Sequence, residues 1–124
     1  DRERLRDLRT AFTRGPAQAR QAGHSEAIGS EGALLAPDAA LGGGIPNGTY
    51  RCRMIKLGAR QPSLPSFTAY PAFTCRIAPA GGTLQSFAKL TGSQRQVGMI
   101  RPHDRLRSLF LGTLVLGDER RALP

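Results

Sequence analysis

The chain has 124 residues, the length of one domain, which excludes a two-domain enzyme. With 40% hydrophobic and 22% charged residues it is too apolar to be disordered throughout, and no apolar run approaches the roughly 18 residues that cross a membrane. The formal net charge is +9. This charge makes a polyanion a candidate partner, although solvated charges on strand faces would give the same balance.

Residues 1–23 are expected to form a helix, because apolar side chains recur at three- and four-residue spacing, as in Leu5, Leu8 and Phe12. Proline lacks the amide hydrogen that a helix interior needs. The sequence therefore predicts a kink, or two shorter helices that meet at Gly15-Pro16. Gly23 is a natural end for this segment.

A second, short helical stretch is expected after residue 24, with Ser25 as its N-cap. Pro37 and the glycines at 42–44 end it. We thus expect a single domain in which residues 1–45 form a helical N-terminal segment and residues 46–124 form a β-meander.

From Asn47 the apolar period changes to two, and Gly, Pro and Ser clusters separate five or six short strands. Short connections predict antiparallel pairing. The expected fold class is mainly β (α+β): an antiparallel β-meander forming a small or partial barrel, with the N-terminal helical segment packed on it. Gly98 and Gly112 predict bulges or sharp coiling that help to close the barrel. The run LFLGTLVL is apolar on both faces and is expected at the centre of the sheet.

Cys52 and Cys75 have matched surroundings, YRCR and FTCR. If their strands form a hairpin in which the two cysteines face each other, Tyr50 lies opposite Ile77 and one face is apolar throughout. A slip of one residue would place an arginine or a threonine opposite each cysteine. The pattern predicts a disulfide between directly facing cysteines, and with it an oxidising compartment such as a periplasm. Two reduced thiols in a cytosolic protein are the alternative.

No catalytic constellation is found in the sequence. His24 and His103 match no zinc spacing with the cysteines, so neither a metal site nor another cofactor is expected. Asp118 and Glu119 are adjacent and would point to opposite faces of a strand, so a turn with a salt bridge is the preferred interpretation. We therefore expect a protein that is not an enzyme.

The strongest candidate ligand site is for an anion. Lys56 and Lys89 stand near glycines at strand ends, where backbone N–H groups and cations can converge. The candidate anion-binding residues are Lys56, Lys89, Ser93, Gln94 and Arg95. A plain hairpin loop with solvated charges is the alternative at TGSQ.

Nucleic-acid binding is disfavoured by the positions of the aromatic residues. Single-strand binders stack bases on exposed rings. Tyr50, Phe73 and Phe110 are predicted on the core face, which leaves Tyr70 and Phe87 as the available rings.

Five blocks of the sequence resemble a known family: GALLAPDAAL, YRCRMIKLG, YPAFTCR, FAKLTGSQRQVGMI and LFLGTLVLGDERRA. They are similar to the signature blocks of an alphaproteobacterial family, domain of unknown function 4893. The resemblance implies an exported protein without an assigned activity, in agreement with the predicted disulfide. It also implies further strand-like segments after the LGDE block, so the chain is expected to be truncated at its C-terminal end and to have an open sheet edge.

These observations favour a non-enzymatic binding or structural domain, periplasmic or otherwise secreted, that holds a small or anionic ligand. The alternative is a polyanion or nucleic-acid binder that uses the basic β-region, residues 50–124, which carries twelve basic residues against three acidic ones. No transmembrane segment is expected, and self-association through the open sheet edge is a further candidate interaction.

Overall fold

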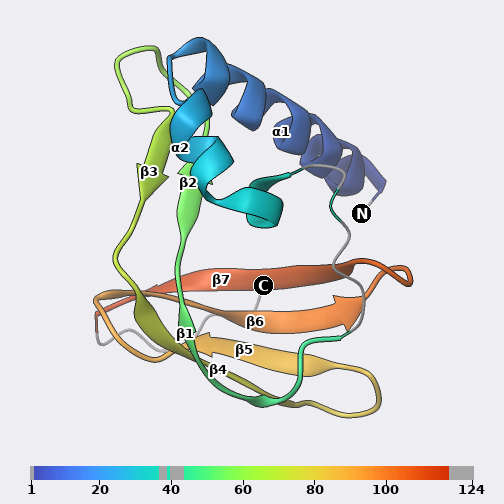
Figure 1. Cartoon of the computed structure of the whole chain (residues 1–124). Coiled ribbons are helices and arrows are strands. Elements are labelled where there is room, and N and C mark those ends of the chain that lie inside the picture. Colours follow the sequence, from blue (N-terminus) through green and yellow to red (C-terminus); the bar gives the residue numbers. More distant parts are fainter. Residues whose placement is uncertain (1, 37–38, 40–43, 118–124) are drawn as a thin grey trace. The chain divides into compact units, whose positions relative to one another are not determined.

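The computed structural model describes residues 2–36, 39 and 44–117 (Figure 1). The chain forms two compact units, the first from Asp1–Ala39 and Met54–Tyr70 and the second from Ala40–Arg53 and Pro71–Pro124. In chain order the helices and strands are α1 (Arg2–Gln21), α2 (Ser25–Ser30), the 3-10 helix η1 (Gly32–Leu35), β1 (Gly48–Cys52), β2 (Ile55–Leu57), β3 (Phe67–Ala69), β4 (Phe73–Pro79), β5 (Gln85–Lys89), β6 (Gln94–Pro102) and β7 (Ser108–Leu116).

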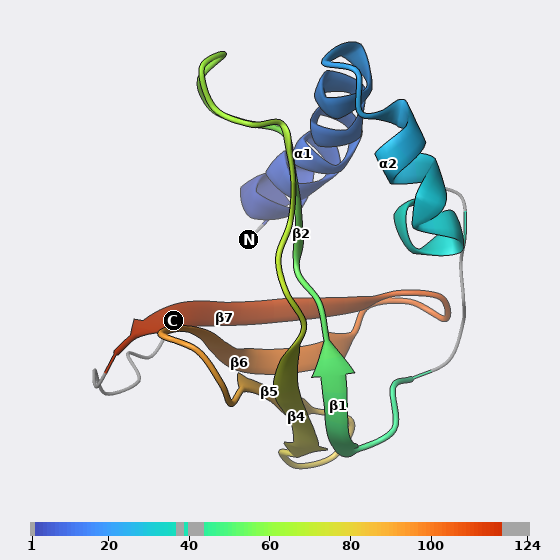
Figure 2. The same cartoon turned by 60° about the vertical axis from the view of Figure 1, so that its left-hand side comes forward.

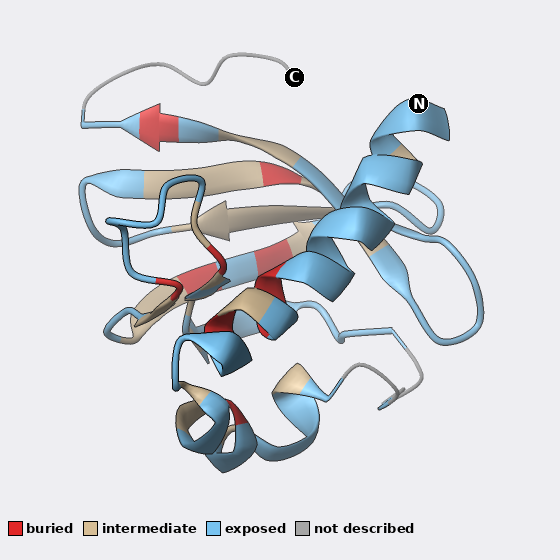
Figure 3. Ribbon diagram, turned by 90° about the horizontal axis from the view of Figure 1, so that it is seen from above, coloured by how far each residue is buried: buried red, intermediate tan, exposed pale blue. Residues whose placement is uncertain are grey.

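Helix α1 runs without interruption through Gly15 and Pro16, so the prediction of two shorter helices is wrong. A residue before proline resists helical geometry partly because its Cβ clashes with the proline ring, and glycine has no Cβ. In Figure 3 the N-terminal half of α1 is mostly exposed, whereas Gly15, Pro16 and Ala19 are buried. The helix ends as predicted just before Gly23, which adopts a φ of 94°.

Within the first unit, α1 crosses the end of β2 at very close range. A Cβ added to Gly15 would lie 2.8 Å from the carbonyl oxygen of Leu57, and one added to Gly58 would lie 3.0 Å from the Cα of Gly15. The side-chain amide of Gln18 donates to the carbonyl of Ala59 at 3.1 Å and accepts from its N–H at 3.0 Å. The glycines therefore permit the crossing and Gln18 fixes it.

The predicted N-cap of α2 is wrong by one residue. His24 is the N-cap, without a side-chain hydrogen bond, and Ser25 is the first helical residue. The turn after α1 fixes His24 as the N-cap, because the His24 N–H donates to the carbonyl of Ala19 at 3.0 Å. The His24 ring also stacks on the ring of Phe67, with centroids 5.7 Å apart. Ile28, one turn further on, is buried.

The second unit is a five-stranded sheet in the order β1-β4-β5-β6-β7, antiparallel throughout, as predicted (Figures 1 and 2). The sheet is not closed into a barrel. In the first unit, β2 and β3 form a separate antiparallel pair. The strands from β1 to β7 thus form one five-stranded sheet and one two-stranded sheet.

Strand β7 lies at the edge of the sheet, so the prediction that it is central is wrong. Apolar side chains on both faces of a strand describe what lies above and below the sheet. They do not show whether the strand has a hydrogen-bonded neighbour on one edge or on both. The bulges predicted at Gly98 and Gly112 are also absent from the β6–β7 pair, in which these glycines face each other in an unbroken register.

The spacing of β6 and β7 explains the two glycines. The His103 N–H donates to the carbonyl of Arg107, and the Gly117 N–H donates to the carbonyl of Ser93. Both pairs continue the register of β6 and β7 beyond the ends of the strands. Hydrogen-bonded pairs alternate with unbonded ones, so Gly98 and Gly112 form an unbonded pair, in which the Cα atoms come closest.

Cys52 and Cys75 form a disulfide, as predicted, but not as directly facing residues. The register places Tyr50 opposite Cys75 and Cys52 opposite Phe73, two residues away from the predicted pairing. The cysteines are therefore diagonal neighbours, with Cα atoms 6.1 Å apart. A shift of two residues leaves every side chain on its predicted face, so the bond still forms.

The sheet has two chemically different faces. The disulfide face carries both cysteines, and its core is the fully buried Cys75 with Ile77. Phe87 and Phe110 meet there edge to face, with centroids 5.5 Å apart. Phe87, expected to be available, is half-buried on this face, whereas Phe110 is 48% exposed. The opposite surface, called the arginine face here, carries Thr49, Arg51, Thr74, Arg76, Arg95 and Arg101 with the apolar Val97, Met99, Leu109, Leu111 and Val115.

Candidate functional site

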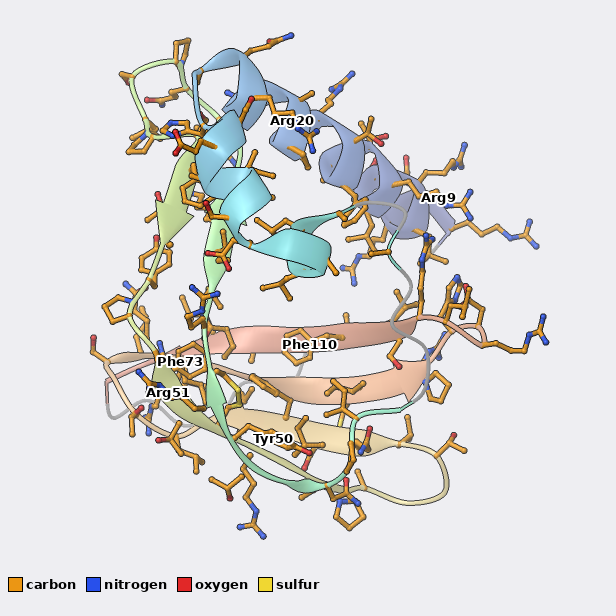
Figure 4. The ribbon with its side chains drawn as sticks, in the orientation of Figure 1. Arg9, Arg20, Tyr50, Arg51, Phe73 and Phe110 are labelled. Atoms are coloured by element: carbon orange, nitrogen blue, oxygen red, sulfur yellow. A yellow bond between two sulfur atoms is a disulfide. The ribbon has the colours of Figure 1, made fainter. Side chains whose placement is uncertain are left out.

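An open hollow of about 640 Å³ lies at one end of the sheet, where β1 and β4 meet the loop after β5. Figure 4 shows Arg51 and Phe73 at this end. The lining residues are Thr49, Tyr50, Arg51, Pro71, Ala72, Phe73, Thr74 and Thr91. The polar residues of this lining are thus three threonines, one tyrosine and one arginine.

The antiparallel register assembles this polar set. Both strands contain the pattern Thr-x-Arg, as Thr49-Tyr50-Arg51 and Thr74-Cys75-Arg76. Pairing in opposite directions places Thr49 opposite Arg76 and Arg51 opposite Thr74. Since alternate residues share a face, the two threonines and two arginines form a checkerboard on the arginine face.

Thr91 joins this set from the loop after β5. Its Oγ1 accepts the backbone N–H of Thr74 at 3.1 Å, and the Leu90 N–H donates to the Thr74 carbonyl at 2.8 Å. A hydroxyl that accepts one hydrogen bond keeps its own hydrogen for another acceptor. The hydroxyl hydrogen of Thr91 can therefore be donated to a ligand in the hollow.

The electrostatic surroundings are strongly basic. Among the described residues of the second unit, one carboxylate, Asp104, accompanies eight basic side chains: Arg51, Arg53, Arg76, Lys89, Arg95, Arg101, Arg105 and Arg107. The N–H of Leu106 donates to the Asp104 carboxylate at 2.8 Å and lowers the pKa of that exposed group. This carboxylate therefore accepts a hydrogen bond within the β6–β7 turn itself.

All four arginines within the strands of this sheet point to one face. Arg76 shares a cross-strand row with Ala88 and Val97. Arg95 and Arg101 lie two and four residues from Val97 on β6, and Arg51 lies two residues from the partner of Arg76. The alternation along each strand therefore collects their positive charges on the arginine face.

The structure separates the anion-binding residues that were predicted from sequence. Lys89 lies on the disulfide face, with its Nζ 4.4 Å from the centroid of the Phe73 ring. Arg95 lies on the arginine face and donates to the carbonyl of Gly117 at 2.6 Å. Ser93 and Gln94 are exposed at the hairpin, and Lys56, on β2, belongs to the first unit. The hollow's own residues were missed, although the repeated Thr-x-Arg pattern signals them.

Other candidate groups from the sequence have structural roles or lie outside the described residues. His24 stacks on Phe67, and the cysteines bond to each other. In the described part of the chain, no three His, Cys, Asp or Glu side chains gather as a metal site. Asp118 and Glu119 lie outside the described residues. No described helix has the length and apolar content needed to span a bilayer.

A family model described as domain of unknown function (DUF4893) matches residues 1–124. The chain therefore belongs to the DUF4893 family, as the sequence blocks suggested. No curated protein and no solved structure matches it.

Proposed function

We propose that this DUF4893 member is a non-enzymatic binding domain that holds an oxyanion group of its ligand, a carboxylate, phosphate or sulfate, in the hollow beside Arg51. The observation that supports this most is the placement of one exposed guanidinium among three threonine side chains. Guanidinium groups match the geometry of an oxyanion, and hydroxyls complete its hydrogen bonding. The neighbouring Arg76 adds a second positive charge.

Binding is favoured over catalysis by the types of side chain in the hollow. The described residues that line it include no carboxylate, imidazole or thiol. General acid–base catalysis needs a group that exchanges a proton near the working pH, and threonine and arginine do not. The hydroxyl of Tyr50, the remaining polar group of the lining, donates to the carbonyl of Pro46. The lining is thus suited to recognising a negative group and not to transforming it.

The proposed compartment is oxidising and extracytoplasmic, a periplasm or the exterior of the cell. The support for this is the Cys52–Cys75 disulfide. Such bonds persist in oxidising compartments and are rare where glutathione and thioredoxin keep thiols reduced. The ligand is then one that the protein meets outside the cytosol.

The test is a titration of the oxidised protein with inorganic phosphate and with sulfate, followed by NMR shifts of backbone amides and of arginine Nε–H groups. We expect saturable shifts at Arg51 and Thr91. Replacing Arg51 by glutamine should weaken binding about tenfold, because a hydrogen bond to a charged group is lost. Arg105→Gln, in the exposed β6–β7 turn, is the matched control and should leave the affinity within about twofold.

A third variant, Lys89→Ala/Arg95→Ala, tests the hairpin site predicted from sequence. If this pair weakens binding more than Arg51→Gln does, the anion is held at the hairpin and the hollow is not the site. Equal losses from Arg51→Gln and Arg105→Gln would indicate a diffuse charge effect and would contradict a localised site.

A polyanion is the second candidate ligand, supported by the four arginines gathered on one face. A single-stranded oligonucleotide would then show steep salt dependence and comparable losses from substitution of each arginine. Tyr50 and Phe73 also line the hollow, but these rings and that of Phe87 are half-buried, so none offers the arginines a fully exposed surface for base stacking. The small oxyanion therefore remains the preferred ligand.

A further inference from the structure

Strand β7 is a long edge strand whose own residues, 108–116, carry none of the usual features that prevent pairing. Among the described residues it pairs with β6 alone, over Ser108–Leu116. Natural edge strands are shortened, bulged, or given charges or proline to prevent addition of another strand. β7 has nine residues, no charge, no proline and no bulge. The opposite edge, β1, has five residues and carries Arg51.

Within the described part of the chain, the backbone of β7 presents an ordered row of groups that no strand pairs with. Because the hydrogen-bonded pairs with β6 fall at the odd-numbered residues, the N–H and C=O groups of Phe110, Gly112 and Leu114 point away from β6. Three successive outward positions, two residues apart, match the repeat at which an antiparallel partner strand forms its bonds. The edge is therefore a template for a further strand.

The side chains of β7 are also exposed on both faces. Phe110 is 48% and Leu114 45% exposed on the disulfide face, and Leu111 is 56% exposed on the arginine face. A partner strand that covers them must itself be apolar on both faces and free of like charges, since the rest of this unit is basic. β7 of a second copy has these properties.

We propose that two copies of this chain associate through β7, antiparallel, with Gly112 on the two-fold axis. This register places Phe110 opposite Leu114 of the second copy, and Leu111 opposite its Thr113. Gly112 faces its own counterpart as a hydrogen-bonded pair, in which each residue donates its N–H to the carbonyl of the other across the axis. The contact is isologous and closes, so it forms a dimer and not a filament.

The size of the contact predicts a weak dimer. About half of each of the side chains of Phe110, Leu111 and Leu114 is exposed, roughly 100 Å² apiece. The two copies together can therefore bury about 600 Å² of side-chain surface in the contact, before the backbone is counted. Stable interfaces bury about 1,200–2,000 Å². We expect a dissociation constant on the order of 10–100 µM. It should fall as salt is added, because screening reduces the repulsion between two positively charged copies.

The test is sedimentation velocity of the oxidised chain at concentrations from about 10 to 500 µM, where a dimer of this strength appears. Leu111→Lys should raise the dissociation constant at least about tenfold, since it places two like charges diagonally across the pair. Leu106→Lys is the matched control. It is equally exposed, at 57% against 56%, but lies in the turn outside β7, so it should leave the dimer intact.

Mixed cysteine variants test the register. Leu111→Cys mixed with Thr113→Cys should form a disulfide-linked dimer, because these residues face each other at an unbonded position. Leu109→Cys mixed with Leu111→Cys should not, since the register leaves them about 13 Å apart. A monomer throughout the concentration range, equal effects of Leu111→Lys and Leu106→Lys, or cross-linking in both mixtures would overturn the proposal.

Discussion

Replacing Gly98 by alanine tests how closely β6 and β7 approach. A Cβ built on Gly98 meets the carbonyl oxygen of Leu111 and the Cα of Gly112, far inside normal contact distance. Both atoms belong to the backbone of β7, so no change of rotamer relieves the overlap. The substitution must therefore push β7 away from β6.

The cost can be worked out from the neighbouring pairs. Hydrogen-bonded pairs flank the glycines, Val97 with Thr113 on one side and Met99 with Leu111 on the other. Weakening about two or three of these backbone bonds costs ~1 kcal/mol each, and disturbing the ring of Phe110 costs a further ~0.5–1.5 kcal/mol. We expect Gly98→Ala to lower the free energy of unfolding by about 3 kcal/mol, out of a typical 5–15 kcal/mol.

Urea unfolding of the oxidised protein, followed by circular dichroism, measures this loss. Gly44→Ala is the control in the same unit, because a Cβ there meets nothing within 4 Å, and it should change stability by less than about 0.5 kcal/mol. Gly112→Ala should lie between the two, since its Cβ meets the Phe110 ring, which can turn, as well as the Val97 carbonyl, which cannot. Equal stability of Gly98→Ala and Gly44→Ala would refute the close approach of the strands.

Three further predictions concern single contacts. Non-reducing peptide mapping should recover Cys52 and Cys75 as one linked peptide, and their joint replacement by serine should cost about 3 kcal/mol in urea unfolding; recovery of two free thiols would contradict the pairing. Gln18→Ala should lower stability by about 1–3 kcal/mol and Gln18→Glu by less, because the carboxylate keeps the acceptor and loses the donor; identical losses would show that the two hydrogen bonds do not hold α1. The Asp104 carboxyl should titrate below its usual pKa in carbon-13 NMR, because the Leu106 N–H bonds its charged form. This contribution to stability is present above the unfolded-state pKa and is lost as pH falls through the lower folded-state value; an ordinary titration would mean that the bond is not maintained in solution.

Sequence periodicity predicted most of the secondary structure but not the strand neighbours. Leu5, Leu8 and Phe12 indicated α1, and the period of two indicated antiparallel strands. Alternation gave the faces of Cys52 and Cys75 correctly but could not distinguish two registers that differ by two residues, since both keep the same faces. The edge position of β7 was missed for a related reason: the pattern of side chains records two apolar faces and contains no information on backbone partners.

The candidate hollow could not be predicted because the expected pairing of Cys52 with Cys75 sets Arg51 opposite Arg76, whereas the structure sets Arg51 opposite Thr74. Thr49 and Arg51 are unremarkable on β1, and so are Thr74 and Arg76 on β4. They form a site only when antiparallel pairing reverses one pattern against the other. Lys89 and Arg95, by contrast, are close in sequence but lie on opposite faces of the sheet. The register of β5 and β6 pairs odd-numbered residues of one strand with even-numbered residues of the other, so two odd-numbered residues face opposite ways.

The Cys52–Cys75 bond closes the chain at the two points where it leaves and re-enters the sheet, and Met54–Tyr70 lies inside that loop. Arg60, exposed between β2 and β3, lies within it as well. A protease that cuts after Arg60 therefore yields one covalent two-chain molecule, which separates into two pieces only on reduction. After such a cut, the disulfide still joins the two segments that form the five-stranded sheet and the hollow of the second unit. We therefore expect the second unit to keep its structure when this loop is cleaved.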